Sequence, residues 1–356
     1  ARRMLRRQTA SAYSQALREQ LGSLILSQDN SVLRAGRPRM PVESDGQLAL
    51  ATVEEEPLDD PPILPTDAQE EIATLIKQRQ QAHRLTEVGL EPPNSLLLQG
   101  PPGVGKTLTA RHLAGELGLP LVTVELAALM SSLLGQTGQN LRQLLDHARS
   151  FPCVLLLDEF DAVAKRRDDQ TDIGELKRLV NVLLVELERW PETGLLIAAT
   201  NHPQLLDPAV ERRFDVILNL TVPGQKERAA ILRRALARVG LEISGQVLAA
   251  CALAQEGASG ADIEREAAAA ARATVLDDGD PTMVIAELAM RRLHDTTGHD
   301  GERRAAFCAV ATQHLGLTQR AVGKVLGISH PTVGKLARQW AAQSDSVGPV
   351  PVGAVK

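Results

Sequence analysis

Residues 100–107 read GPPGVGKT, and they follow directly after the apolar run Ser95–Gln99. Residues 107–117, TLTARHLAGEL, then have the composition of a helix. A buried strand, a glycine-rich turn and a helix N-terminus together place backbone N–H groups and the positive end of a helix dipole around a phosphate chain. Lys106 has the reach to contact the β- and γ-phosphates, and the Thr107 hydroxyl can ligate Mg²⁺. The stretch therefore predicts a nucleoside triphosphate site.

Two further apolar runs end in residues that suit phosphate chemistry. The run CVLLLDE ends in Asp158 and Glu159, and the run GLLIAATN ends in Asn201. Open α/β sheets bind ligands at the carboxyl ends of their strands. There, Asp158 can join Thr107 in holding Mg²⁺, and Glu159 can polarise an attacking water. The Asn201 amide can hydrogen-bond the γ-phosphate and that water, although asparagine at a strand end is also a common turn residue.

Composition narrows the class of protein. The 356 residues are 44% hydrophobic but only 2% aromatic, which disfavours a base-stacking surface for single-stranded nucleic acid. The three cysteines have no CxxC spacing, so a disulfide scaffold and a zinc site are both disfavoured, and a reducing cytoplasm is expected. No apolar run approaches the ~20 residues of a membrane span, so we expect no membrane contact.

Charge and periodicity divide the chain into segments. Residues 41–72 carry ten acids and no Lys or Arg, whereas residues 302–340 carry six basic residues and one acid. A basic end of this kind suits a polyanionic partner. The patterns predict an N-terminal helix (1–28), an acidic proline-rich linker (29–65), a large α/β domain (66–223), a helical domain (224–298), a helical module (302–341) and a disordered tail (342–356).

The large domain contains five apolar runs that alternate with helical stretches. These runs are 95–99, 121–126, 153–159, 194–201 and 216–222. Near-continuous apolar strands between helices are typical of a parallel sheet that is covered on both faces.

The motifs and their order resemble those of the AAA subgroup of AAA+ ATPases, the branch that contains FtsH, katanin and spastin. GPPGVGKT resembles Walker A, and LLLDEFDA (155–162) resembles Walker B. TNHPQLLDPAVERRFDVILNLTVP (200–223) resembles the second region of homology, and GASGADIE (257–264) resembles the GxSGAD motif. Over about 63–296, the resemblance implies a P-loop AAA+ fold with a parallel five-stranded sheet and a small α-helical lid.

The same resemblance implies a ring of identical subunits, usually a hexamer, with ATP and Mg²⁺ as cofactors. Arg212 and Arg213 of ERRFD match the arginine fingers that reach a neighbour's γ-phosphate, and which of them dominates stays open. The implied nucleotide-binding residues are Pro101, Pro102, Gly103, Val104, Gly105, Lys106, Thr107, Leu108, Gly260 and Ala261, with Ile63 and Leu64 beside the adenine. The implied catalytic residues are Lys106, Glu159, Asn201, Arg212 and Arg213, and the implied metal ligands are Thr107 and Asp158.

Two loops leave alternatives open. In 131–136, Leu133 occupies the position where AAA unfoldases place an aromatic residue that grips a peptide, but a leucine there is also an ordinary core residue. The charged loop 165–172 can line a pore or be a plain solvated loop.

Residues 318–340, TQRAVGKVLGISHPTVGKLARQW, predict two short helices. Gly327 breaks the first helix, Ser329 is a good N-cap and Pro331 fits the first turn of the second. The pattern resembles an all-α helix-turn-helix of the repressor type, which reads the major groove of double-stranded DNA. The expected base contacts are His330, Thr332 and Lys335, and the expected phosphate contacts are Arg338, Lys324 and Gln319. Modules of this kind also bind proteins, which is the alternative.

Three functions follow from these features. The first is an ATP-hydrolysing ring that remodels a protein partner while its C-terminal module holds DNA. That architecture resembles bacterial AAA proteins that are paired with a subtilisin-like protease in plasmid-maintenance and phage-defence modules. The second is a DNA-binding regulator or a replication or transposition helper whose ATP cycle controls assembly on DNA. The third is a scaffold with vestigial ATPase function, which the intact acidic pair disfavours.

Overall fold

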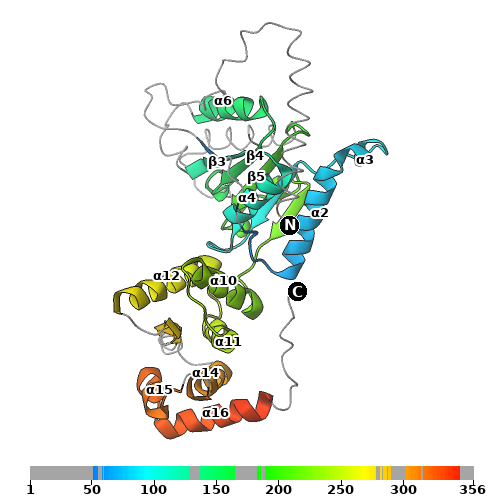
Figure 1. Ribbon diagram of the computed structural model, residues 1–356. Coiled ribbons are helices and arrows are strands. Elements are labelled where there is room, and N and C mark those ends of the chain that lie inside the picture. Colours follow the sequence, from blue (N-terminus) through cyan, green and yellow to red (C-terminus); the bar gives the residue numbers. More distant parts are fainter. Residues whose placement is uncertain are drawn as a thin grey trace. The chain divides into compact units, whose positions relative to one another are not determined.

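The computed structural model describes residues 51–54, 58, 60–127, 137–164, 183, 185, 189–277, 281–282, 284–286, 288–289, 301–313 and 316–344 (Figure 1). The chain folds into two compact units, which we describe separately. Of the described residues, those within 51–60, 72–98 and 107–217 form the first unit, and those within 61–71, 99–106 and 218–344 form the second. Both units are built from segments that are far apart in the sequence.

A sheet of six strands forms the centre of the α/β fold. Its strands lie in the order β1 (Thr52–Glu54), β3 (Leu121–Glu125), β4 (Val154–Asp158), β5 (Leu195–Thr200), β2 (Ser95–Gln99) and β6 (Val216–Asn219). Strands β3, β4 and β5 are parallel neighbours, and β1 pairs with β3 in the antiparallel direction. All five predicted strands are present, and the expected α/β fold is confirmed.

The sheet differs from the prediction at its edge, because it has six strands and is mixed rather than parallel. The additional strand β1 lies within the segment expected to be a linker, with Thr52 opposite Thr123. Its three residues, TVE, are too short and too polar to give a strand pattern. The Arg111 guanidinium of α4 (Lys106–Leu117) pairs with the Glu54 carboxylate at 2.7 Å and so fixes the end of β1.

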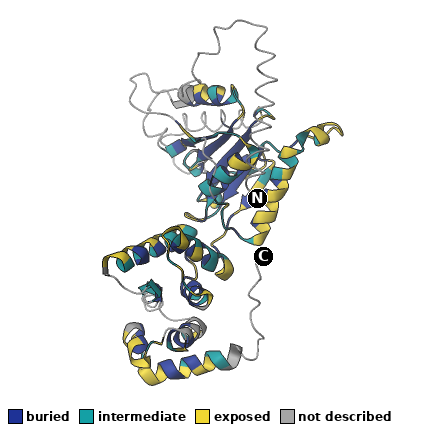
Figure 2. Cartoon of the chain, in the orientation of Figure 1, coloured by how far each residue is buried: buried dark blue, intermediate teal, exposed yellow. Residues whose placement is uncertain are grey.

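Helices cover both faces of this sheet. Helix α4 leads from β2 to β3 across two strands, whereas α6 (Thr137–Arg149) leads from β3 to the adjacent β4 in the opposite direction. Right-handed crossovers then place α4 and α6 on opposite faces, as Figure 1 shows. The strands between them are almost entirely buried (Figure 2). Helices α2 (Thr66–Gln80), α3 (Ala82–Thr86), α7 (Asp161–Ala164), α9 (Pro208–Glu211) and the 3₁₀ turn η2 (Pro203–Leu205) complete this part.

The C-terminal part of the second unit is helical. It contains α10 (Gln225–Arg238), α11 (Gly245–Ala254), α12 (Gly260–Asp277), α14 (Gly301–Gln313), α15 (Gln319–Leu326) and α16 (His330–Ser344). The buried guanidinium of Arg228 donates to the carbonyl oxygens of Ala252 (2.7 Å) and Pro223 (2.8 Å). It therefore ties α10 both to α11 and to the chain that enters the helical segment.

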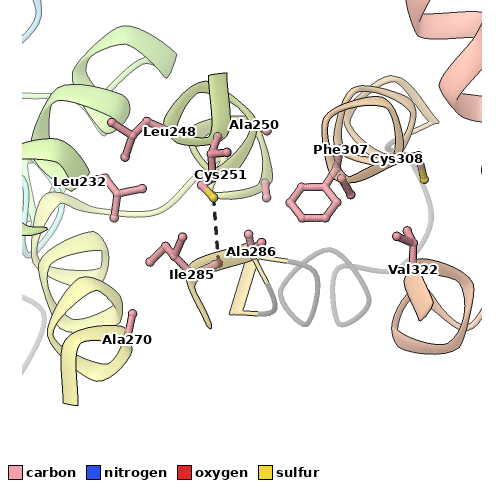
Figure 3. Close-up of a cluster of buried hydrophobic side chains, with 14 of the residues drawn as sticks. Leu232, Leu248, Ala250, Cys251, Ala270, Ile285, Ala286, Phe307, Cys308 and Val322 are labelled. Atoms are coloured by element: carbon pink, nitrogen blue, oxygen red, sulfur yellow. Dashed lines mark hydrogen bonds between the residues drawn. The ribbon is translucent and has the colours of Figure 1, made fainter. Parts of the chain in front are cut away.

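One hydrophobic cluster runs through these helices. Figure 3 shows Leu248 and Cys251 of α11, Phe307 of α14 and Val322 of α15 within it. The two segments that the sequence separates at residues 298–302 therefore share a core. Helix α16 also continues to Ser344, three residues past the end predicted for the module.

The three cysteines, Cys153, Cys251 and Cys308, are free and buried in this structure. Burial raises the pKa of Cys153 and Cys251 to about 12 and that of Cys308 to about 11, so these thiols stay protonated at neutral pH. Within the described residues, no group of three or more His, Cys, Asp or Glu side chains is placed to hold a metal ion, and no helix is both long and apolar enough to cross a bilayer.

The shared core makes a stability prediction. Phe307 is 1% exposed, and Phe307→Ala is expected to lower the free energy of unfolding by about 3–5 kcal/mol because it leaves a cavity in the cluster. Val275 on α12 is 75% exposed, so Val275→Ala is the control and should stay within about 0.5 kcal/mol of the parent. Urea unfolding of both variants measures the difference. Equal stabilities would show that the cluster does not hold these helices.

Candidate functional site

The glycine-rich turn after β2 has a backbone that side chains would obstruct. Gly103 and Gly105 have φ of 77° and 105°, in the left-handed region that favours glycine. A Cβ on Gly103 would lie 2.7 Å from the Ser259 hydroxyl and 3.0 Å from the Ala261 Cβ. A Cβ on Gly100 would collide with the Leu220 carbonyl oxygen. The turn therefore requires its glycines both for conformation and for space.

Lys106 is buried, with 7% of its surface exposed. Its ammonium donates to the carbonyl oxygens of Gly100 (2.7 Å) and Pro101 (2.9 Å), which are both part of the same turn. The charge is thus held at the centre of the loop, where it can meet a phosphate.

The start of α12 packs on this turn. The Ala261 N–H donates to the Gly103 carbonyl at 3.1 Å, so the GASGAD motif contacts the P-loop directly. Ser259 and Asp262 form a capping box in which the Asp262 N–H donates to the Ser259 hydroxyl at 3.2 Å and the Ser259 N–H donates to the Asp262 carboxylate at 3.1 Å. Hydrogen bonds from the Ser259 hydroxyl and then from its N–H lower the pKa of the Asp262 carboxyl.

The predicted nucleotide-binding residues of the loop are contiguous along the turn and the first turn of α4. Pro101, Pro102 and Gly103 are exposed, Gly105, Thr107 and Leu108 are half-buried, and Val104 and Lys106 are buried. Gly260 lies against the Gly103 carbonyl, and a side-chain carbon of Leu64 would lie 3.6 Å from a Cβ on Gly105. Leu64 and the lid residues thus lie beside the loop, and their contacts with an adenosine stay a prediction.

The two predicted metal ligands are brought together. The Thr107 hydroxyl, in the first turn of α4, donates to Asp158 Oδ2 at the end of β4 across 3.3 Å. The other carboxylate oxygen, Oδ1, accepts from the Glu159 N–H at 2.8 Å. A hydroxyl and a carboxylate oxygen at this spacing are donors that Mg²⁺ prefers, so these residues fit the ion.

Glu159 holds a strained backbone. Its φ is 54°, and it is the non-glycine residue with positive φ among the described residues. Its side chain is exposed at the carboxyl end of β4. Such outliers cost about 1–3 kcal/mol and gather at functional sites.

Asp161, which the sequence analysis did not select, joins the ends of β4 and β5. Its Oδ1 accepts from the Thr200 hydroxyl at 2.8 Å and from the Asn201 N–H at 3.2 Å. The available signal was weak, because an acid two residues after Asp158-Glu159 is also an ordinary first residue of a helix. The structure therefore places the predicted Asn201 one residue past β5 and ties it to the turn that carries Glu159.

Arg212 and Arg213 are exposed beside a firmly anchored segment. The next residue, Phe214, is buried and packs edge-to-face on Phe160 with ring centroids 5.9 Å apart. Asp215 Oδ2 accepts from two N–H groups and a hydroxyl at the start of β2. The backbone that carries Arg212 and Arg213 is thus held in place, and the action of these arginines on a neighbouring subunit stays a prediction.

Three predicted features lie outside the described residues. They are the loop 131–136 with Leu133, the charged loop 165–172 and the N-terminal helix 1–28. Residues 29–50 of the predicted linker and residues 345–356 of the predicted tail also lie outside the described residues.

The C-terminal helices α15 and α16 are joined by a three-residue turn in which Gly327 adopts the left-handed conformation. They cross closely, since a Cβ on Gly334 would lie 2.9 Å from the Gln319 amide oxygen. All six predicted DNA contacts are exposed, namely Gln319, Lys324, His330, Thr332, Lys335 and Arg338. The Thr332 hydroxyl also bonds the Ser329 cap at 2.7 Å, so it is partly committed to the helix start.

The glycine turn gives a matched pair of variants. Gly103→Ala is expected to weaken nucleotide binding about tenfold or more, because its Cβ would displace the start of α12 from the loop. Gly118 has a similar φ of 68° with open space around it. Gly118→Ala should therefore lower only the free energy of unfolding, by roughly 1–2 kcal/mol, and leave nucleotide affinity unchanged. Titration with a fluorescent ATP analogue measures both. Equal affinities would contradict the steric argument.

The strain at Glu159 gives a second prediction. Glu159→Gly should be more stable than Glu159→Ala by about 1 kcal/mol, because only glycine relieves the left-handed backbone. Both variants lack the carboxylate, so their difference isolates the backbone cost. Urea unfolding provides the measurement, and an alanine variant of equal stability would argue against the strain.

Comparison with known proteins agrees with this geometry. Residues 96–222 match the model of the ATPase family associated with various cellular activities (AAA). The chain is 41% identical over 203 residues to the uncharacterized AAA family ATPase y4kL of Sinorhizobium fredii, which covers 57% of this chain and 61% of that protein. It is 38% identical over 172 residues to the ATP-dependent zinc metalloprotease FtsH 3 of Sphaerobacter thermophilus, covering 47% and 35%.

The fold is also similar to that of a solved structure, the FIGL-1 AAA domain in complex with ADP. The TM-score is 0.56 at 25% sequence identity, over 74% of this chain and 93% of that one. The chain spans about three fifths and about one third of the two curated relatives. The loop, the acidic strand end and these matches together show that residues 96–222 have the α/β fold of an AAA domain.

Proposed function

We propose that the protein is a Mg²⁺-dependent ATPase that assembles as a ring, usually a hexamer, and couples ATP hydrolysis to the remodelling of a protein partner. The observation that carries the proposal is the Thr107–Asp158 contact at 3.3 Å, directly beside Lys106 and Glu159 in the chain. Thr107 and Asp158 would hold Mg²⁺, which supplies charge neutralisation at the phosphates. Lys106 binds the phosphates, and Glu159 accepts a proton from the attacking water.

Assembly into a ring is supported by the arginine pair. Arg212 and Arg213 are exposed, while Phe214 and Asp215 fix their backbone to the core and to β2. Exposed arginines on a rigid support suit a site that a neighbouring subunit completes, because the guanidinium must arrive at a defined position. ATP is the proposed nucleotide, since a similar AAA domain was solved with ADP.

A protein as the object of remodelling is supported by relatives. One relative that matches the AAA domain is by name an ATP-dependent metalloprotease. The match covers 35% of that protein, so the proposal assigns to this chain the ATP-driven step and leaves cleavage to a separate protease. A cytoplasmic plasmid-maintenance or phage-defence pair is the setting we propose.

DNA is the proposed anchor for this ring. Lys324, Lys335 and Arg338 lie exposed on α15 and α16. The sequence of residues 302–340 contains six basic residues and one acidic residue. The turn at Gly327 and the close crossing at Gly334 give the two helices the compact arrangement that lets a second helix enter a major groove.

A second candidate function is a DNA-bound regulator in which ATP controls assembly only. The core shared by α12, α14 and α15 favours it, because the helices that would hold DNA belong to the same hydrophobic cluster as the helix that contacts the P-loop. The two functions differ in whether protein remodelling requires continuous ATP turnover.

The hydrolysis proposal is tested with Glu159→Gln. Removing the base should lower ATP turnover by about 10²-fold or more while ATP still binds. Glu125→Gln makes the same chemical change at the end of the adjacent strand β3 and should leave turnover unchanged. Turnover with and without double-stranded DNA, and the mass of the ATP-bound Glu159→Gln protein, are measured together. A monomer with full activity would contradict both the base and the ring.

DNA anchoring is tested with Lys335→Ala. Lys335 is exposed and is the proposed contact to a DNA base, so its removal should weaken binding to duplex DNA about tenfold. Lys226→Ala removes the same charge from exposed α10 and should leave DNA affinity unchanged. Binding is measured by fluorescence anisotropy at several salt concentrations, because phosphate contacts weaken with salt. Equal DNA affinities of the two variants would contradict DNA anchoring through Lys335 and favour a protein-binding role for the C-terminal helices.

A further inference from the structure

The turn between β4 and α7 is bonded to the end of β5 by both backbone and side chain. The Phe160 N–H donates to the Ala199 carbonyl at 2.9 Å, where the paired register of β4 and β5 has ended at Leu157 and Ala198. The next residues of the strand end, Thr200 and Asn201, donate to the Asp161 carboxylate instead. Side-chain hydrogen bonds thus continue the contact between the two segments past the last paired residues of β4 and β5.

Asp161 acts on two successive residues of this strand end. Its Oδ1 accepts from the Thr200 hydroxyl at 2.8 Å and from the Asn201 N–H at 3.2 Å. Thr200 is fully buried, and its hydroxyl oxygen accepts in turn from the His202 N–H at 3.0 Å. The backbone on both sides of Asn201 is therefore fixed by one chain of hydrogen bonds that begins at Asp161.

A simple helix-capping role does not account for these bonds. An acid in the first turn of a helix is stabilised by the helix dipole, but α7 has only four residues. The carboxylate instead accepts hydrogen bonds from Thr200, the last residue of β5, and from Asn201, which follows it. Charge-assisted hydrogen bonds of this kind are about twice as strong as neutral ones, so the contact holds position as well as contributing stability.

We propose that Asp161 is a positioning residue that fixes Asn201 relative to Glu159. The inference rests on the proposed function, in which Glu159 and Asn201 act on the same water and phosphate. Glu159 lies two residues before Asp161, and Asn201 is its direct partner. Misplacing a catalytic group by about 1 Å can cost about 10²-fold in rate, so this bond matters for hydrolysis more than for ATP binding.

The test is a double-mutant cycle on the full chain. Asp161→Ala should lower kcat by about 10–100-fold and leave the affinity for ATP within about twofold. In the Asn201→Ala background, Asp161→Ala should cause no further loss, because nothing remains to be positioned. Asp161→Asn keeps an oxygen acceptor and should recover most of the rate. Steady-state kinetics, ATP-analogue titration and urea unfolding are recorded for each protein.

Two more variants keep the test decisive. Thr200→Val removes only the hydroxyl between Asp161 and His202, so it carries the test if Asp161→Ala fails to fold. Asp207 caps the short helix α9 through the Ala209 N–H at 2.9 Å, and Asp207→Ala is the control for a purely structural aspartate. Its effect on kcat should be the same with and without the Asn201 side chain.

The outcomes separate the inference from the function on which it rests. If Asn201→Ala is slow and Asp161→Ala adds a full further loss, the positioning role is overturned and the hydrolysis proposal stands. If ATP affinity falls as much as kcat, Asp161 has a structural role and the inference is likewise overturned. If Asn201→Ala is as fast as the parent, or the parent has no turnover, the proposed roles fail together with the inference.

Discussion

The turn that follows β4 is the constraint on which the rest of the site depends. Each of the four residues 158–161 has its own structural role. Asp158 meets the Thr107 hydroxyl, Glu159 adopts a left-handed backbone, Phe160 packs on Phe214, and Asp161 accepts from the end of β5. A single tight turn therefore links the start of α4, the strand end that carries Asn201 and the segment that carries the two arginines. A shift of this turn would move all of these groups at once.

A second set of contacts surrounds the glycine turn. The N-terminus of α12 is seated on Gly103 through the Ala261 N–H, and the Ser259–Asp262 capping box sets its position. Helix α12 shares one hydrophobic cluster with α10 and α11 before it and with α14 and α15 after it. Since packed cores deform little, a ligand that displaces the start of α12 acts on a body of helices rather than on one. The cluster thus joins α14 and α15 to the helix that contacts the glycine turn.

Much of the domain was predictable because its signals are local. The five apolar runs predicted the central strands, and GPPGVGKT predicted the glycine-rich loop. That motif and the acids that end CVLLLDE also predicted the two Mg²⁺ ligands, Thr107 and Asp158, whose oxygens lie 3.3 Å apart in the structure. The edge strand β1 was missed, since three residues carry no periodicity. Asp161 and the Phe160–Phe214 pair were missed because their partners lie 39 and 54 positions away in the chain, where spacing along the sequence carries no information.

The sequence by itself determined the class of fold, the phosphate-binding turn and the identity of the acids and amide that end its strands. These features depend on residue type and on neighbours within a few positions, which is what local sterics and hydrophobic periodicity encode. Only the tertiary structure decided which groups meet. It set the antiparallel edge of the sheet, the seating of α12 on Gly103, the core shared by the C-terminal helices and the carboxylate that holds Asn201. These are contacts between distant segments, and packing in three dimensions is the physical cause that selects them.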